Sequence, residues 1–97
     1  ADEKEAHHLA SQAIKEKLAA CGNILAPHLA VYEWEGKVQS EQETALILKT
    51  QNRHFEALEI LITNLHSYEC PCIVALPIEH GHATFLDWII SETIKHE

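Results

Sequence analysis

Residues 44–50 of this chain read Thr-Ala-Leu-Ile-Leu-Lys-Thr, an apolar run that ends abruptly at a lysine. Such a run is typical of a strand buried on both faces. It is followed by an amphipathic helix over 53–65, with Asn52 as its cap, and then by the apolar stretch 73–78. Residues 44–78 therefore predict a complete β-α-β unit with two buried strands.

A long hairpin is predicted before this unit. Residues 24–34 alternate as a strand does, Pro27 marks an irregular entry, and Glu35-Gly36-Lys37 forms a short turn. The returning strand is polar over 38–43 and apolar over 45–48. Its first half should therefore be exposed or meet a partner, and its second half should be central.

The chain opens with an amphipathic helix predicted over about residues 3–21. Asp2 and Glu5 have capping-box spacing, and Gly22 supplies a stop. With a last helix over 84–95 the order is α-β-β-α-β-α. The first helix would complete a second β-α-β unit if a strand preceded it. We therefore expect an α+β, ferredoxin-like β-α-β-β-α-β domain, with a further C-terminal helix, whose first strand is absent from this chain. The alternative is a three-stranded sheet covered by helices.

The composition and charge of the chain exclude several classes of function. The 97 residues make one domain, 1–97, with 7 Lys and Arg against 15 Asp and Glu and a formal charge of −8. This balance argues against nucleic acid and anionic membrane surfaces. No apolar run approaches the roughly 20 residues of a membrane span, and the start has no signal-peptide pattern. A soluble protein of the cytosol or of an organelle lumen is therefore expected, with the cytoplasm preferred. Three cysteines indicate reduced thiols rather than a disulfide framework.

No catalytic motif accompanies this composition. The chain contains no Gly-rich phosphate loop, no HExxH and no recognisable Ser/His/Asp order, so we expect a protein that is not an enzyme. A nucleophile–base pair of Cys21 with His66 is the one alternative that residue types allow. Cys21 is predicted at a helix C-terminus, where the dipole disfavours a thiolate.

Five segments, taken in order, resemble the CutA family of divalent-ion tolerance proteins. They are Leu18-Ala19-Ala20-Cys21, Tyr32-Glu33-Trp34-Glu35-Gly36-Lys37, Leu48-Lys49-Thr50, His66-Ser67-Tyr68-Glu69-Cys70-Pro71, and Pro77-Ile78 with Phe85-Leu86-Asp87-Trp88. The resemblance implies a ferredoxin-like domain in a homotrimer similar to the nitrogen-regulatory PII proteins. It also implies tolerance and binding of copper or another divalent ion, none obligatory, with a regulatory role at clefts between subunits. Ser67 and Cys72 depart from the family pattern, which has Pro and Glu there.

The resemblance also implies the site. Its metal ligands would be His66 and Cys21, and its cleft would be lined by the residues Lys49, Tyr68, Glu69, Tyr32 and Trp34. The alternative is a structural or regulatory trimer that binds a small ligand or a protein partner without a physiological metal.

Several of these residues have a second interpretation. Cys70 and Cys72 would share a face of a strand, where packing is favoured over metal binding. Lys49 needs an acidic partner, with Glu33, Glu43 and Glu69 as candidates, or an anionic ligand. Trp34 should pack on a neighbouring subunit, and Trp88 should be core. Exposed histidines bind Cu²⁺ weakly in any fold; these are His7, His8, His80 and His82.

Overall fold

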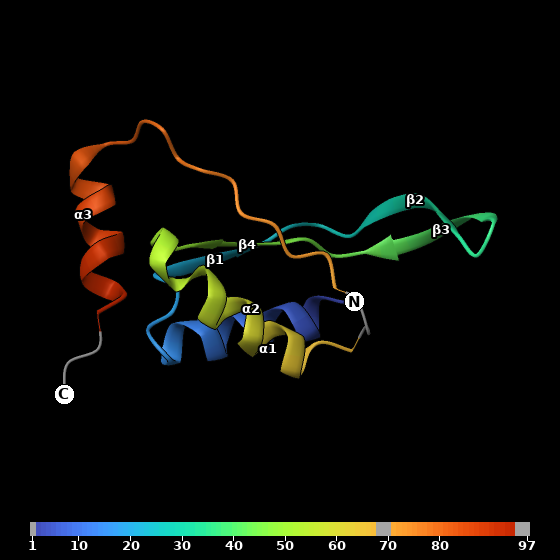
Figure 1. Cartoon of the computed structure of the whole chain (residues 1–97), viewed down its shortest axis with the longest axis horizontal. Helices are drawn as coiled ribbons and strands as arrows, with labels where there is room; N and C mark the ends of the chain where they lie inside the picture. The colour runs from blue at the N-terminus through green and yellow to red at the C-terminus, as the bar shows by residue number, and fades with distance from the viewer. Residues whose placement is uncertain (1, 68–70, 95–97) are drawn as a thin grey trace.

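The computed structural model describes residues 2–67 and 71–94 and has a body from which a two-stranded arm projects (Figure 1). Its extents are 47 × 29 × 21 Å, and the arm lies along the longest of them. The elements are α1 (Glu3–Lys15), β1 (Cys21–Ile24), β2 (His28–Trp34), β3 (Lys37–Glu43), β4 (Leu46–Lys49), the 3₁₀ turn η1 (Asn52–His54), α2 (Phe55–Leu65) and α3 (Ala83–Glu92).

The four strands form two antiparallel pairs, and the Leu25 N–H donates to Ala45 O at 2.9 Å between them. β1 pairs with β4 in the body, and β2 pairs with β3 in the arm. Between the pairs Ile24↔Leu46 and His28↔Glu43, the three residues 25–27 oppose the two residues 44–45. This extra residue has the count of a β-bulge, which bends a ribbon and increases its twist. Pro27, which has no N–H for the ladder, lies in this bulge, so the predicted irregular entry is confirmed.

The arm ends in a two-residue turn. Glu35 and Gly36 both have positive φ, 52° and 79°, which a type I′ hairpin requires. Trp34 pairs with Lys37 across the turn, so the arm register is set here. The predicted hairpin is confirmed.

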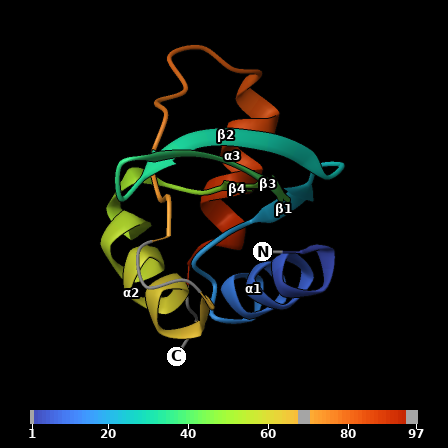
Figure 2. The same ribbon diagram turned by 90° about the vertical axis from the view of Figure 1, so that its right-hand side faces the viewer.

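Helices α1 and α2 lie side by side against one face of the β1–β4 pair (Figure 2). A Cβ on Gly22 would lie 3.2 Å from the Ala10 Cβ and 3.1 Å from the Leu48 side chain, so glycine permits α1 to approach the strand closely. Ala13, Ala19 and Leu58 form the centre of the core. Cys21, Asn23, Ile47 and Lys49 alternate with the helix-facing residues and therefore lie on the opposite face.

The predicted end of the first helix is wrong by about six residues. Helix α1 ends at Lys15, because Lys17 takes a left-handed φ of 61°. The Lys17 N–H then donates to Ile14 O at 3.0 Å and the Leu18 N–H to Ala13 O at 2.9 Å. This is the Schellman pattern, here with a lysine where glycine is usual. Cys21 consequently begins a strand and does not lie at a helix terminus.

The start of the second helix also differs from the prediction. Asn52 is not a side-chain cap, because it begins η1, and α2 follows at Phe55 without any side-chain capping bond. The span of the apolar face is otherwise as predicted, with Leu58 buried.

The predicted buried strand over 73–78 is wrong. This segment has no strand pairing, and Val74, Leu76 and Ile78 are 73%, 85% and 57% exposed. Among the described residues β4 pairs only with β1. An apolar, β-branched run becomes a strand only where a neighbouring strand offers its backbone groups, and no described strand lies beside this segment. Figure 1 shows the segment running away from the sheet toward α3.

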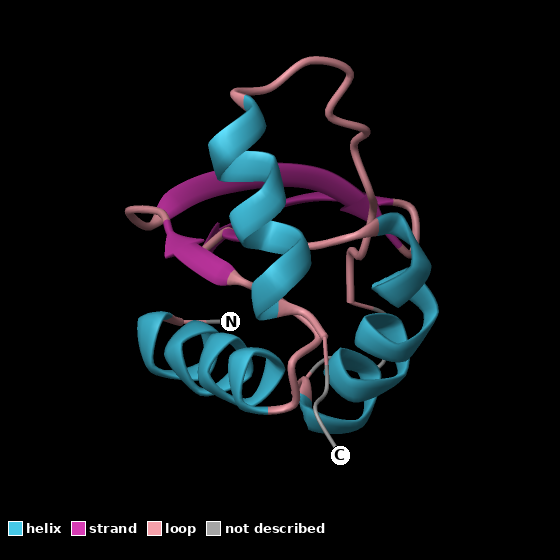
Figure 3. Ribbon diagram, turned by 90° about the vertical axis from the view of Figure 1, so that its left-hand side faces the viewer, coloured by secondary structure: helices cyan, strands magenta, loops and turns pink. Residues whose placement is uncertain are grey.

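Helix α3 crosses the end of the sheet that lies opposite the arm (Figure 3). Thr93, 1% exposed, attaches it: Gln51 Nε2 donates to Thr93 Oγ1, and His54 Nε2 lies against Thr93 O, both at 2.8 Å. The expected core position of Trp88 is wrong, because Trp88 stacks on Phe85 and both are over 40% exposed.

In the described part of the chain, no helix has the length and apolarity to cross a membrane.

Candidate functional site

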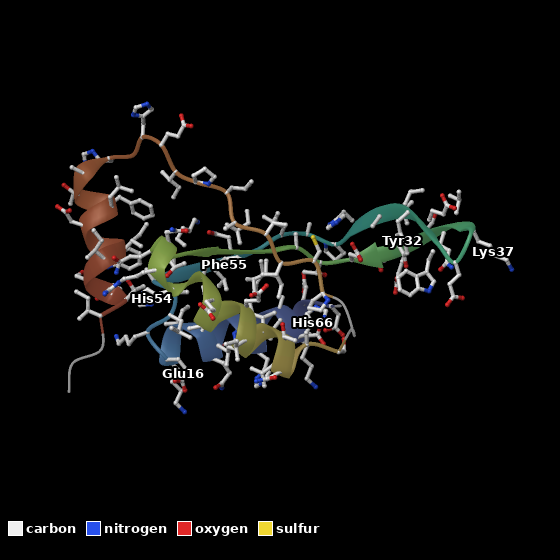
Figure 4. The ribbon with its side chains drawn as sticks, in the orientation of Figure 1. Glu16, Tyr32, Lys37, His54, Phe55 and His66 are labelled. Carbon is white, nitrogen blue, oxygen red and sulfur yellow. The ribbon has the colours of Figure 1, made fainter. Side chains whose placement is uncertain are left out.

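His66 lies directly after α2, at the end of that helix nearest the arm (Figure 4). Its N–H donates to Ile62 O at 2.7 Å, and its backbone then becomes extended, so the imidazole position is set by the last helical turn. Its side chain is only 16% exposed. Residue 66 therefore has a well-defined position at the end of α2.

Glu5 faces His66 from α1. Its carboxylate Oε1 lies 3.4 Å from His66 Nε2, and its side chain is 19% exposed. The sequence suggested that Glu5 acts in a capping box. Its N–H does donate to Asp2 Oδ1, at 2.9 Å, but its carboxylate reaches across to α2. Because Glu5 lies one turn before the buried Leu9, it belongs to the packed side of α1, and a carboxylate there needs a partner. The spacing of Glu5 one helical turn before Leu9 is the feature of the sequence that could have predicted this contact.

The electrostatics favour a charged Glu5. The pKa of the Glu5 carboxyl is lowered, and both a hydrogen bond from the Ser67 side chain and the charge of His66 act in this direction. Partial burial acts against them. Glu5 therefore presents a carboxylate oxygen at neutral pH.

Most of the other described histidines are exposed. These are His7, His8, His28, His80 and His82. His54 is half-buried, but its Nε2 lies 2.8 Å from the Thr93 carbonyl oxygen, at the opposite end of α2 from His66 (Figure 4). A carbonyl oxygen only accepts, so that nitrogen carries the proton and has no lone pair for a metal.

Cys21 and Lys49 are brought together on the sheet face opposite the helices. They are paired residues of β1 and β4, and Lys49 Nζ donates to Asn23 Oδ1 on the same face. No described carboxylate forms an ion pair with Lys49, so the acidic partners Glu33 and Glu43 are wrong. Because His66 contacts Glu5 of α1, it lies on the helical side of the sheet, and one copy does not bring Cys21 to it.

Tyr32 and Trp34 lie on the arm, which leads away from the body (Figure 4). Tyr32 donates to Glu41 Oε2 at 2.7 Å across the hairpin, and Trp34 is 56% exposed. The opposite face carries Leu29, Val31 and Val38, which are 68%, 64% and 76% exposed and are called the apolar arm face below. By register the polar residues Glu33, Ser40 and Gln42 lie on the same face. One copy therefore does not bring Tyr32 and Trp34 to Lys49.

Three residues of the predicted site segment, Tyr68, Glu69 and Cys70, lie outside the described residues. Cys72 is described and exposed, so the expectation that it packs in the interior is wrong. Over residues 2–67 and 71–94, no three His, Cys, Asp or Glu side chains gather as a metal-binding group. The pair of His66 and Glu5 supplies one nitrogen and one oxygen, a donor set that suits Cu²⁺, Zn²⁺ or Ni²⁺.

The sequence of the chain is similar to known proteins of one family. The family model described as CutA1 divalent ion tolerance protein matches residues 1–92. A divalent-cation tolerance protein CutA of Archaeoglobus fulgidus is 42% identical over 92 residues, which cover 95% of this chain and 88% of the relative. The chloroplastic CutA of Arabidopsis thaliana is 45% identical over 85 residues, 88% of this chain but 47% of that protein.

Solved structures agree with the sequence comparisons. The A. fulgidus structure, described as a periplasmic divalent cation tolerance protein, superposes with a TM-score of 0.93 at 40% identity, covering 96% of this chain and 90% of that one. CutA1 from Oryza sativa gives a TM-score of 0.93 at 39% identity, with 98% and 87% coverage. The ferredoxin-like α+β expectation is confirmed. This chain belongs to the CutA1 divalent ion tolerance protein family.

Proposed function

We propose that this protein is a homotrimeric divalent-cation tolerance protein that binds copper or another divalent ion through His66. Its relatives are named for divalent-cation tolerance. The observation on this chain that carries the proposal is the environment of His66, which is 16% exposed and faces a carboxylate, whereas five other described histidines are exposed. A half-buried imidazole beside an anionic oxygen favours a bound cation over weak surface binding.

A titration with Cu²⁺ tests the metal. His66→Ala is expected to lower the affinity of the tightest site steeply, and His80→Ala, an exposed histidine before α3, is expected to leave it nearly unchanged. Equal losses in the two variants would assign the binding to surface imidazoles and reject the proposal. Because Cu²⁺ can oxidise Cys21 and Cys72, the titration is repeated with redox-inactive Zn²⁺.

The trimer is supported by the apolar arm face. Three large aliphatic side chains stand more than 60% exposed on a two-stranded projection, and a two-stranded hairpin alone is marginally stable in water. Within one copy Tyr32 and Trp34 lie on the arm, away from Lys49. A cleft that contains all three residues would therefore form between copies. Tyr68 and Glu69 are proposed to line the same cleft. Light scattering at micromolar concentration tests it, and a folded single copy would reject it.

A second function is a regulatory trimer that binds a small ligand or protein without a physiological metal. The hydrogen-bonded Lys49 and Asn23, beside the Cys21 thiol on a sheet face free of α1 and α2, favour this candidate. Chelator-treated protein that binds no Zn²⁺ on re-addition, yet keeps its trimer and melting temperature, would favour this second function.

We propose a cytoplasmic location and a role in binding rather than catalysis. Two relatives are described as chloroplastic and periplasmic, so the compartment needs its own measurement. The free thiols of Cys21 and Cys72 suit a reducing compartment. Labelling of thiols in intact cells with a membrane-impermeant reagent is expected to leave both unmodified, and modification of the exposed Cys72 would contradict the location.

A further inference from the structure

We propose that Glu5 and His66 are two ligands of one divalent-metal site, which joins the first turn of α1 to the end of α2. This inference rests on the proposed function, because it names the partner of His66 in that site. Glu5 was not among the metal ligands that the sequence suggested, and it lies 61 positions before His66.

The spacing of the two groups is the first argument. Glu5 Oε1 and His66 Nε2 lie 3.4 Å apart. A charge-assisted N–H···O hydrogen bond is about 2.7–2.9 Å long, so this pair is wider than an optimal bond. Imidazole nitrogen and carboxylate oxygen bind zinc at about 2.0–2.2 Å, and two such ligands at a tetrahedral angle lie about 3.3–3.4 Å apart. The pair therefore has the separation of two ligands without any movement.

Preorganisation is the second argument. Both side chains are less than one-fifth exposed, and each belongs to a backbone position that is hydrogen-bonded: Glu5 to the Asp2 cap and His66 to Ile62. The two helices are packed through the Ala13–Leu58 core. An ion that binds here meets ligands whose conformational entropy is already lost in folding, so binding costs less than at a pair of mobile surface side chains.

The chemical nature of the two ligands determines which metal ions the site prefers. A neutral imidazole and a carboxylate are borderline and hard ligands, so the site suits Zn²⁺, Cu²⁺ or Ni²⁺ and disfavours Cu⁺, which prefers thiolates. The described pair leaves the remaining coordination positions of the ion to water or to other groups. Because the ligands belong to different helices, the bound ion also links α1 to α2, and the folded state gains stability with metal concentration.

The decisive variant is Glu5→Gln, with Glu3→Gln as its matched control on the same helix. Glu3 is exposed, and its substitution changes the charge equally. Calorimetric titration of the intact protein with Zn²⁺ is expected to show a loss of affinity in Glu5→Gln larger than the roughly 10–100-fold effect of removing an outer-shell partner. Glu3→Gln is expected to keep the affinity. Equal affinities in the two variants would overturn the inference and leave Glu5 as the structural ion-pair partner of His66.

A double-mutant cycle separates this inference from the proposed function. If both groups bind one ion, Glu5→Gln with His66→Ala should bind about as weakly as His66→Ala alone, whereas independent effects would multiply. A His66→Ala protein with unchanged affinity rejects the proposed site itself. A large effect of His66→Ala together with none of Glu5→Gln rejects only the present inference.

The melting temperature gives a second readout. Zn²⁺ is expected to raise it in the wild type and in Glu3→Gln but not in Glu5→Gln, whatever the metal-free stabilities are. Should Glu5→Gln fold poorly, Glu5→Asp keeps the charge and shortens the reach by one methylene. An undiminished zinc-induced rise in the Glu5→Asp variant would then count against direct ligation.

Discussion

The body and the arm use similar side chains in opposite environments. In the body Ala13, Ala19 and Leu58 are at most 5% exposed, whereas Val31 and Val38 of the arm are 64% and 76% exposed. Of the eight buried hydrophobic residues in the described chain, five are alanines, so the core within one copy is built from small groups. Burial stabilises a fold roughly in proportion to the apolar area that is removed from water. The small side chains of this core bury little apolar area, whereas the arm exposes a large apolar area that association could bury.

This difference explains why a short chain keeps an extended hairpin. A residue that is apolar and exposed in one copy costs nothing in folding that copy, but it drives association when a second surface covers it. Body substitutions should therefore act on the folding of each copy, and arm substitutions on assembly.

The largest effect is expected from Val31→Thr combined with Val38→Thr. Both changes keep the β-branched shape and strand propensity but place hydroxyl groups in the proposed interface, at about 2 kcal/mol each. Each interface of the proposed trimer thus loses about 4 kcal/mol, and sedimentation equilibrium should detect dissociation at micromolar concentration. Gln39→Thr, on the opposite face of the arm, serves as the control. A trimer as tight as the wild type would remove the apolar arm face from the interface.

Leu58→Ala should act on the body alone. Removing a buried leucine typically lowers the free energy of unfolding by 2–5 kcal/mol, and a value of about 3 kcal/mol is expected here. Urea denaturation at a fixed protein concentration measures it. Ile60→Ala on the same helix, where the side chain is 56% exposed, should lose far less. Comparable losses of unfolding free energy at both positions would show that exposure within one copy does not identify the residues of the core.

Thr93→Val tests the attachment of α3 to the body. The substitution removes the hydroxyl that accepts from Gln51 Nε2 and leaves a half-buried donor unpaired, at a cost of about 1–2 kcal/mol. Amide exchange should accelerate over residues 83–92 and remain unchanged in α1. Thr84→Val, on the exposed start of α3, is the matched control. Uniform acceleration over both helices would mean that α3 does not unfold separately.

The smallest effect, and a favourable one, is expected from Lys17→Gly. Lys17 has a φ of 61°, which is costly for a residue with a Cβ and free for glycine. After the entropy of the unfolded glycine is subtracted, the gain is about 0.5 kcal/mol. Lys15→Gly, within the last helical turn, should instead destabilise by a similar amount. A melting temperature that falls in both variants would contradict the role of Lys17 in ending α1.

The sequence predicted elements well where the signal was local. Periodicity gave both amphipathic helices, and the Glu35-Gly36 pair gave the hairpin turn. It placed the end of α1 wrongly, because Gly22 was taken as the stop and only the structure shows a lysine in the left-handed position. Residues 73–78 have the composition of a strand, but composition does not provide the neighbouring strand that a ladder needs.

The candidate site was predicted only in part, for the same reason. His66 was assigned through the resemblance of residues 66–71 to the CutA pattern, and that pattern is a local run of sequence. Its contact with Glu5 depends on how α1 packs on α2, which no spacing along the chain reveals. The arrangement of Cys21 opposite Lys49 likewise depends on strand register, and this register follows from the bulge at Pro27.

The arm has one further consequence, which concerns symmetry. Its two sides differ chemically, with Leu29, Val31 and Val38 on one side and Tyr32 and Trp34 on the other. Where such an arm lies on the body of the next copy, each copy offers one surface and receives a different one. Head-to-tail contacts of this kind stop growing only when the rotation between neighbours closes a ring, and they otherwise continue as a filament. In the proposed trimer the bend at residues 25–27 would help set that rotation, so lengthening or deleting this bulge should change the number of subunits that close the ring.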